Sequence, residues 1–156
     1  MSADDAEITI DEKFSNLIAQ GDLATMMSFP DLPARVQARD DEGWTPLHWA
    51  ALYGHADCAG FLIAHGAPVD AQSHRGETPL MIAAESRQKS AFAVLLAAGA
   101  REDLTRENGD TAASILREQK ADDFLSVLRD ALAERSSVLQ KAVSVLPSPT
   151  VRKRLN

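Results

Sequence analysis

The residues best suited to chemistry are four histidines and a single cysteine. His48, His55, His65 and His74 follow one another at intervals of seven, ten and nine. No pair has the i, i+4 spacing that holds zinc on one face of a helix, and His65 and His74 are expected to be exposed rather than ligating. A lone cysteine permits neither a disulfide framework nor a zinc site based on cysteine spacing. We therefore expect no metal and no cofactor, and we expect Cys58 to be a small buried hydrophobe rather than a nucleophile.

Carboxylates form two clusters, Asp40-Asp41-Glu42 and Asp122-Asp123. The first falls in a predicted turn. The second falls near a predicted helix start, where negative charge interacts favourably with the helix dipole. Neither cluster has a convincing acid–base partner in the sequence, and the chain lacks a phosphate loop, a G-x-S-x-G motif and a dinucleotide-binding fingerprint. The sequence predicts no catalytic residues and no enzymatic activity.

Composition and charge narrow the class of protein. The 156 residues are 45% hydrophobic and 25% charged, as in a soluble globular domain. The formal net charge of −7 argues against general binding to nucleic acids. The charge is uneven, because 23 acidic and 12 basic residues up to Gln140 give −11, whereas residues 141–156 carry +4. The N-terminus lacks the apolar stretch of a secretory signal, and no run approaches the roughly 18 apolar residues of a membrane span, so we expect a cytoplasmic protein.

The candidate residues lie within an internal repeat that has a period of 33. The stretch EGWTPLHWAALYGH, residues 42–55, aligns with RGETPLMIAAESRQ, residues 75–88. The matching positions are Gly43, Thr45, Pro46, Leu47, Ala50 and Ala51 with Gly76, Thr78, Pro79, Leu80, Ala83 and Ala84. Repeats of this length indicate a stack in which each unit buries its apolar face against its neighbours.

Fainter matches one step earlier and one step later extend the repeat to about four units. We expect two full units, at 41–73 and 74–106. A degenerate unit is expected before them, at 9–40, and another after them, at 107–139. Outside the repeats, we expect a disordered acidic N-terminus at 1–8. Residues 140–156 are expected to form a helix extension and a flexible basic tail.

Each unit is predicted to contain two short helices and a turn. Threonine can cap the first helix and proline fits its first position, as at Thr45-Pro46 and again one period later at Thr78-Pro79. Gly54 is expected to end this helix in a left-handed conformation. Arg87 occupies the same position in the next unit, where a left-handed backbone would cost about 1 kcal/mol.

The two end units carry different start and stop signals. Thr9 and Glu12 are spaced for a capping box at the first helix of the chain. Pro30 and Pro33 are expected to cut the second helix of that unit short. In the last unit the second helix has no glycine stop, and we expect it to continue to about Val145.

The residues of the full units resemble the ankyrin repeat, whose signature is T-P-L-H-x-A at a period of 33. Residues 45–50 match that signature in full, and the resemblance covers roughly residues 10–135. It implies an all-α solenoid of stacked helix-turn-helix units with turn or β-hairpin tips. It also implies that His48 bonds to Thr45 and to the neighbouring backbone, and that His55 starts the second helix. The next unit departs from the signature at Met81, where the family usually has histidine.

The resemblance implies that a partner protein docks on the turn tips and on the exposed side of the first helices. The positions that carry over are Asp41, Glu42, Trp44, Leu52, Tyr53, His74, Arg75, Glu77, Glu85, Ser86, Glu107, Asn108 and Asp110. Trp44 and Tyr53 are the strongest candidates, because these residue types are enriched among interface hot spots and a tip tryptophan has no place in the core of the stack. The alternative for Trp44 is that it covers the neighbouring turn. Trp49 is expected to serve packing.

We therefore expect a non-catalytic interaction module that acts as an adaptor, an inhibitor or an assembly factor and is a monomer when free. Its partner is expected to be another protein rather than a nucleic acid. The alternative function is a structural subunit, held in an oligomer or a larger complex through the C-terminal helix and basic tail. The tail at 141–156 has three interpretations: a solubility tail, a linear motif for another protein, or a segment that binds an anionic surface or the acidic repeats of its own chain.

Overall fold

A computed structural model describes residue 10 and residues 12–145 of the chain. The predicted N-terminal segment 1–8, the proposed capping residue Thr9 and residues 146–156 of the tail lie outside the described part. The described helices are α1 (Glu12–Gln20), α2 (Leu23–Met27), α3 (Leu32–Arg35), α4 (Pro46–Tyr53), α5 (Ala56–Ala64), α6 (Pro79–Glu85), α7 (Lys89–Ala97), α8 (Ala112–Glu118) and α9 (Asp122–Val145).

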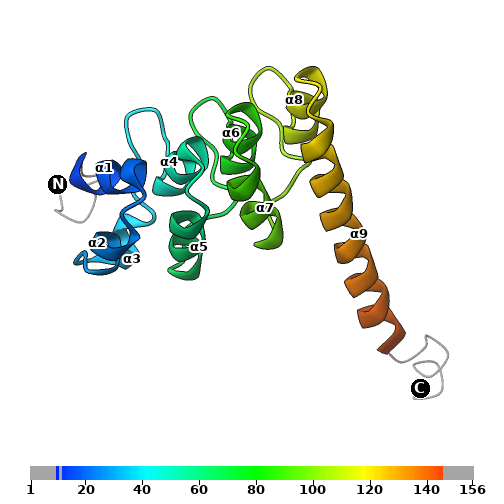
Figure 1. Ribbon diagram of the computed structural model, residues 1–156, viewed down its shortest axis with the longest axis horizontal. Coiled ribbons are helices and arrows are strands. Elements are labelled where there is room, and N and C mark those ends of the chain that lie inside the picture. Colours follow the sequence, from blue (N-terminus) through cyan, green and yellow to red (C-terminus); the bar gives the residue numbers. More distant parts are fainter. Residues whose placement is uncertain (1–9, 11, 146–156) are drawn as a thin grey trace, which may run out of the picture.

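The helices stack as pairs along one axis (Figure 1). Helices α1, α4, α6 and α8 form one layer, in which each helix contacts the next. Helices α2, α5, α7 and α9 continue the second layer in the same way. This arrangement confirms the predicted all-α solenoid. The loops between units form hairpin-shaped tips, and the described residues contain no β-strand at these tips.

The first helix of each full unit begins where the repeat predicts. Thr45 and Thr78 have extended backbones and directly precede Pro46 and Pro79, the first residues of α4 and α6. The Thr78 hydroxyl accepts a hydrogen bond from the Met81 N–H at 3.3 Å. This bond satisfies one of the N–H groups that lack a partner within the first turn of a helix.

The first helix of each unit is followed by a residue in the left-handed region. Gly21, Gly54, Arg87 and Lys120 recur once per unit and have φ angles of 70°, 74°, 56° and 53°. Arg87 thus keeps the left-handed conformation of Gly54, and the cost expected for it there stays a prediction. Because Arg87 and Lys120 carry a Cβ, the backbone of the repeat imposes a conformation there that glycine adopts more easily.

The core of the stack combines small and large apolar side chains in register. Ala50 and Ala51 of α4 are completely buried, which allows neighbouring first helices to approach closely. In the second layer Leu62, Leu95 and Leu128 occupy equivalent positions of three successive units, and all three are buried. The apolar face of each unit is thus covered by the units on either side.

The two ends of the stack differ from its centre. Helix α2 ends at Met27, before Pro30, so the predicted shortening of this helix is confirmed. At the other end α9 runs to Val145, as predicted from the missing stop signal. Arg135 fixes α9 to the C-terminal end of α7, because its guanidinium donates to the carbonyl oxygens of Leu96 and Ala100. These carbonyls lie where the negative end of the α7 dipole favours a cation.

A regular series of side-chain bonds ties each unit to the one before it. In three consecutive units, a polar side chain reaches a carbonyl oxygen at the end of the preceding first helix. The pairs are His55 Nε2 with Ala19 at 2.9 Å, Gln88 Nε2 with Leu52 at 3.2 Å, and Gln119 Nε2 with Glu85 at 3.1 Å. The three acceptors occupy equivalent positions of their units, at helix ends where carbonyl groups lack partners within their own helix.

Candidate partner-binding surface

The histidine with the most distinctive surroundings, His48, has a structural role. Its ring is completely buried, and the Thr45 N–H donates to Nδ1 at 3.0 Å. Since Nδ1 accepts this bond, the ring hydrogen lies on Nε2, which donates to the Glu77 carbonyl oxygen of the next unit at 2.9 Å. Burial lowers the pKa of His48 from 6.5 to about 4. His48 therefore links two units as a neutral side chain, which confirms the role implied by the repeat.

The other candidates for chemistry also have structural or exposed positions. His55 precedes α5 as expected, whereas His65 and His74 are exposed. Cys58 is buried on α5, and burial raises the pKa of its thiol. A buried thiol with a raised pKa is a poor nucleophile. Among the described residues, no group of three or more histidine, cysteine, aspartate or glutamate side chains is arranged to hold a metal ion.

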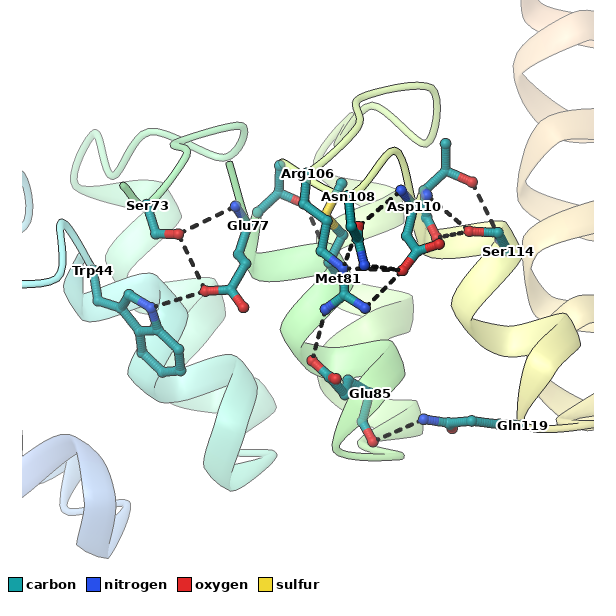
Figure 2. A network of polar contacts seen from close by, with 12 residues as sticks. Trp44, Ser73, Glu77, Met81, Glu85, Arg106, Asn108, Asp110, Ser114 and Gln119 are labelled. Carbon is teal, nitrogen blue, oxygen red and sulfur yellow. Dashed lines mark hydrogen bonds and ion pairs between the residues drawn. The ribbon is translucent and has the colours of Figure 1, made fainter. Parts of the chain in front are cut away.

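Trp44 lies half-buried between two units rather than fully exposed at a tip. Its indole N–H donates to Oε2 of Glu77 at 3.3 Å, and Ser73 donates to the same oxygen at 3.1 Å (Figure 2). The indole ring stacks on His48 with ring centres 5.6 Å apart. The expectation that Trp44 has no place in the core is therefore wrong in part. The indole contacts Glu77 of the next unit as well as His48 and Trp49 of its own, and it remains partly exposed.

Aromatic rings continue from Trp44 along the exposed side of α4. Trp49 lies 5.2 Å from Trp44 between ring centres, and its N–H donates to Oδ2 of Asp40 at 3.2 Å. Tyr53 stacks on Trp49 with an interplanar angle of 17° and is 45% exposed. Trp49 packs as expected, but it also forms part of the surface row of rings.

The aromatic row borders a hollow of about 320 Å³. Its lining combines two indoles and one aliphatic side chain with three carboxylates, from Trp44, Trp49, Leu52, Asp40, Asp41 and Glu42. Apolar walls with a few convergent polar groups are typical of sites that bind another molecule. The carboxylates give the hollow a negative rim.

Two further hollows extend this one across the tips. A hollow of about 190 Å³ shares Asp41, Glu42 and Trp44 with the first and reaches His74 and Arg75. A third, of about 390 Å³, is lined by Arg75, Glu77, Arg106, Glu107 and Asn108. Because neighbouring hollows share lining residues, they adjoin one another along three successive tips, and we call the three together the tip groove.

The far end of the tip groove is organised by Arg106. Its guanidinium donates to Asp110 Oδ2 at 2.8 Å and to Asn108 Oδ1 at 3.0 Å, and it forms an ion pair with Glu85 at 3.4 Å (Figure 2). Hydrogen bonds from Arg106 and Asn108 lower the pKa of Asp110. Asp110 and Glu85 therefore already have internal partners, whereas Glu107 lies exposed beside them.

The tip groove brings together nine of the thirteen residues predicted from the sequence. The other four are Tyr53, which adjoins Trp49, Glu85 and Asp110, which contact Arg106, and Ser86, which is half-buried at the end of α6. Besides Trp49, which was expected to serve packing, three further residues of this surface were not predicted, namely Asp40, Ser73 and Arg106. These three residues lie 33 positions apart, and each lies four positions before a predicted tip residue. This regular spacing is the signal in the sequence that could have identified them.

Comparison with known protein families identifies the repeat. A family model described as "Ankyrin repeats (3 copies)" matches residues 16–108, which is more than half of the chain. No curated protein matches the chain. In the part that the structure describes, no helix is long and apolar enough to cross a membrane. Ankyrin repeats generally mediate contacts between proteins and are typically not catalytic. The matched residues include both full T-P-L units and the tip groove between them, and the chain belongs to the ankyrin-repeat family.

Proposed function

We propose that the chain is a non-catalytic module that binds a partner protein in the tip groove. The observation that carries this proposal is the row of three adjoining hollows, from the aromatic hollow at Asp40 to the tip at Asn108. A row of hollows can follow an extended segment or a helix edge of a partner. A cytoplasmic adaptor, an inhibitor and an assembly factor would all use such a surface.

The chemistry of the groove favours a particular kind of partner segment. Indole faces beside carboxylates attract cations, through the ring quadrupole and through direct ion pairing. The aromatic hollow therefore suits an arginine or lysine that is flanked by an apolar side chain. The exposed Arg75 suits an acidic or amide group, which would set the direction in which the segment lies, whereas Arg106 is already paired with Asp110 and Glu85.

The two indoles are held in place before any partner arrives. The side chains of Glu77 and Asp40 accept the indole hydrogens of Trp44 and Trp49. The ring hydrogen bonds and the ring stacking restrict side-chain motion, so little conformational entropy remains to be lost on binding. Rigid aromatic anchors of this kind account for much of the affinity at many protein interfaces.

The proposal is tested by affinity capture from the native host, followed by mass spectrometry. Leu52→Arg places a cation in the aromatic hollow and is expected to abolish capture of the partner at unchanged thermal stability. Ala64→Arg adds the same side chain at an exposed position of α5, outside the groove, and is expected to leave capture intact. Equal capture by both variants would refute the groove as the binding surface.

Trp44 and Trp49 provide a second comparison. Trp44→Ala is expected to weaken capture more than it lowers the unfolding midpoint, because the partly exposed indole lines two of the hollows. Trp49→Ala is expected to lower the midpoint first, because Trp49 lies within α4, where the substitution removes its stacking on Tyr53 and its bond to Asp40. The reverse order would refute these roles. Since Trp44 also stacks on His48, we expect a measurable loss of stability from both substitutions.

A further inference from the structure

The charge of the tip groove changes along its length. The aromatic hollow is lined by three carboxylates, from Asp40, Asp41 and Glu42, and by no cation. The second hollow keeps two of these carboxylates and adds Glu77 and the guanidinium of Arg75. In the third hollow two guanidinium groups balance two carboxylates. A ligand that spans the groove should therefore be most cationic at the aromatic end.

Two of the carboxylates at the aromatic end are available to a ligand. Asp40 is already engaged, because Oδ1 accepts from the backbone N–H of Trp44 at 2.8 Å and Oδ2 accepts from the indole of Trp49 at 3.2 Å. Asp41 and Glu42 are exposed, and their carboxylates have no partner among the described residues. Asp40 thus fixes the rings, and the other two carboxylates remain to pair with a cation.

The arginines near the tip groove differ in what they bond to. Arg39 lines none of the three hollows, and its guanidinium donates to two backbone carbonyl oxygens, at 3.0 and 2.9 Å. Arg106 has the internal partners described above. Arg75 is exposed, and in the described part of the chain its guanidinium has no ion pair, although Glu77 and Glu107 line the same hollow. Arg75 is therefore free to bond to a carboxylate of a ligand.

A guanidinium suits the aromatic hollow better than an ammonium does. The rings of Trp44 and Trp49 have centres 5.2 Å apart and planes inclined at 59°, so a cation in the hollow meets two ring systems. A guanidinium is planar and weakly hydrated, stacks on aromatic rings and bonds to a carboxylate through two N–H groups at once. An ammonium is a compact, strongly hydrated charge. The hollow therefore favours arginine over lysine.

The dimensions of the tip groove favour an extended segment. Arg75 lies one repeat after Glu42, and the first helices of their units, α4 and α6, pack directly against each other. Packed helices lie about 8–10 Å apart, a distance that an extended chain covers in about three residues. The second hollow has a volume of about 190 Å³. A single helical turn, about 5.4 Å long and about 10 Å across, has roughly twice that volume.

We propose that the tip groove binds an extended segment of a partner protein, with an arginine in the aromatic hollow and an acidic side chain about three residues away, beside Arg75. The inference rests on the proposed function and adds the residue types of the ligand and their spacing. The arginine neutralises the aromatic end of the groove, and the acidic side chain pairs with its free guanidinium. A helical segment, or one that carries lysine alone, meets only part of these requirements.

The first test selects peptides from a displayed library of random eight-residue sequences on the whole 156-residue chain. Wild type is expected to enrich peptides with an arginine and an acidic residue about three positions apart, always in the same order. Arg75→Glu is expected to keep the arginine and to replace the acidic residue by a basic one. Arg87→Glu makes the same change at an exposed position of the same unit, outside the groove, and is expected to enrich the wild-type pattern. No enrichment, a variable spacing, or an unchanged pattern with Arg75→Glu would overturn the proposal.

The second test uses the fluorescence of Trp44 and Trp49, which are the only tryptophans of the chain and both line the aromatic hollow. An enriched peptide is titrated beside two versions in which lysine or citrulline replaces the arginine. Citrulline keeps the planar group without its charge and is expected to raise the Kd by at least about tenfold, and lysine by a smaller factor. Equal affinities of the three peptides, or an unchanged emission on binding, would refute the placement of the arginine.

Two outcomes distinguish this proposal from the proposed function. If Leu52→Arg abolishes partner capture but the enriched peptides lack the pattern, the tip groove remains the binding surface and only its proposed ligand is refuted. If Leu52→Arg leaves capture unchanged, both proposals are refuted. The basic residues Arg152, Lys153 and Arg154 of a second copy are an alternative occupant of the aromatic hollow. Self-association that Leu52→Arg abolishes, measured by sedimentation equilibrium, would show this occupant and overturn the proposal.

Discussion

The two central units, α4–α5 and α6–α7, share a backbone but differ in what they bury and what they expose. Three residues after the capping threonine, α4 buries His48 and α6 buries Met81. The histidine bonds to its own cap and to the next unit, whereas the methionine fills the same space without polar bonds. The comparison shows that the repeat specifies a buried side chain of a given size there, and that a polar one is compatible when every polar atom has a partner.

The exposed positions of the two units diverge further. Where the first unit has Trp44 and Leu52, the second has Glu77 and Glu85. The first unit therefore provides the aromatic hollow, and the second provides carboxylates that bond to Trp44 and Arg106. We therefore expect binding specificity to arise from the positions that the repeat leaves free, while the shared positions hold the units together.

The largest effect on the free energy of unfolding is expected when the buried residue of one central unit, His48 or Met81, is replaced by its counterpart from the other. His48→Met leaves the Thr45 N–H and the Glu77 carbonyl without their side-chain partner, so the free energy of unfolding should fall by about 2–4 kcal/mol. The reciprocal Met81→His places the ring one period after His48, beside the equivalent Thr78 and Asp110, and should be tolerated better than His48→Met. Urea denaturation measures both, and a neutral His48→Met would show that the inter-unit bonds add little to stability.

The same histidine should make stability depend on pH. Its pKa is about 4 in the folded protein and near 6.5 in the unfolded chain, so between these values the unfolded chain binds more protons. The free energy of unfolding should therefore fall as the pH is lowered, with His48 accounting for about 2 kcal/mol of the loss between about pH 7 and 5. Denaturation of wild type and His48→Met at both pH values isolates this contribution, because other titrating groups are common to both proteins. A constant difference between the two proteins would contradict the lowered pKa.

Smaller effects are expected at the left-handed position that follows each first helix. A Cβ at Gly54 would lie 2.1 Å from Oε1 of Gln88 and disturb the bond of that side chain to the Leu52 carbonyl. Gly54→Ala should lower the free energy of unfolding by about 1–2 kcal/mol, whereas Arg87→Gly should be neutral or raise it by up to about 1 kcal/mol. Thermal denaturation compares the two. A clear drop for Arg87→Gly would show that the arginine side chain makes a stabilising contact.

The smallest effect concerns the bond between Trp44 and Glu77. A double-mutant cycle with Trp44→Phe and Glu77→Ala should give a coupling of about 0.5–1 kcal/mol, since the bond is only partly buried. Pairing Trp44→Phe with Glu107→Ala provides the matched control, which should be additive. Equal couplings in the two cycles would mean that the indole hydrogen bond does not contribute to stability.

Features that recur from one unit to the next could be predicted from the sequence. The left-handed backbone of Arg87 follows from Gly54 one unit earlier, and the length of α9 follows from the leucine at 132 where two earlier units have glycine. Capping by threonine could be predicted for the same reason. In each case the residue at the equivalent position of another unit indicates the local conformation. The sequence around that position is therefore sufficient for the prediction.

Contacts between units could not be predicted in the same way. The Trp44–Glu77 bond, the ion pair of Arg106 with Glu85 and the docking of Arg135 on α7 depend on the rotation and rise from one unit to the next. Residue types do not encode these two quantities. For this reason the sequence leaves open whether Trp44 is a free tip residue or covers the neighbouring turn, and the structure shows its indole N–H bonded to Glu77 of the next unit.

The bonds from each unit to the preceding first-helix carbonyl also have a mechanical consequence. The acceptors at Ala19, Leu52 and Glu85 lie one after another along the stack, so a pull between its two ends would load these bonds in series. Since each unit contacts only its neighbours, one junction can yield while the next remains intact. The protein should therefore lengthen in discrete steps under tension, and a single-molecule force trace should show a sawtooth rather than one rupture.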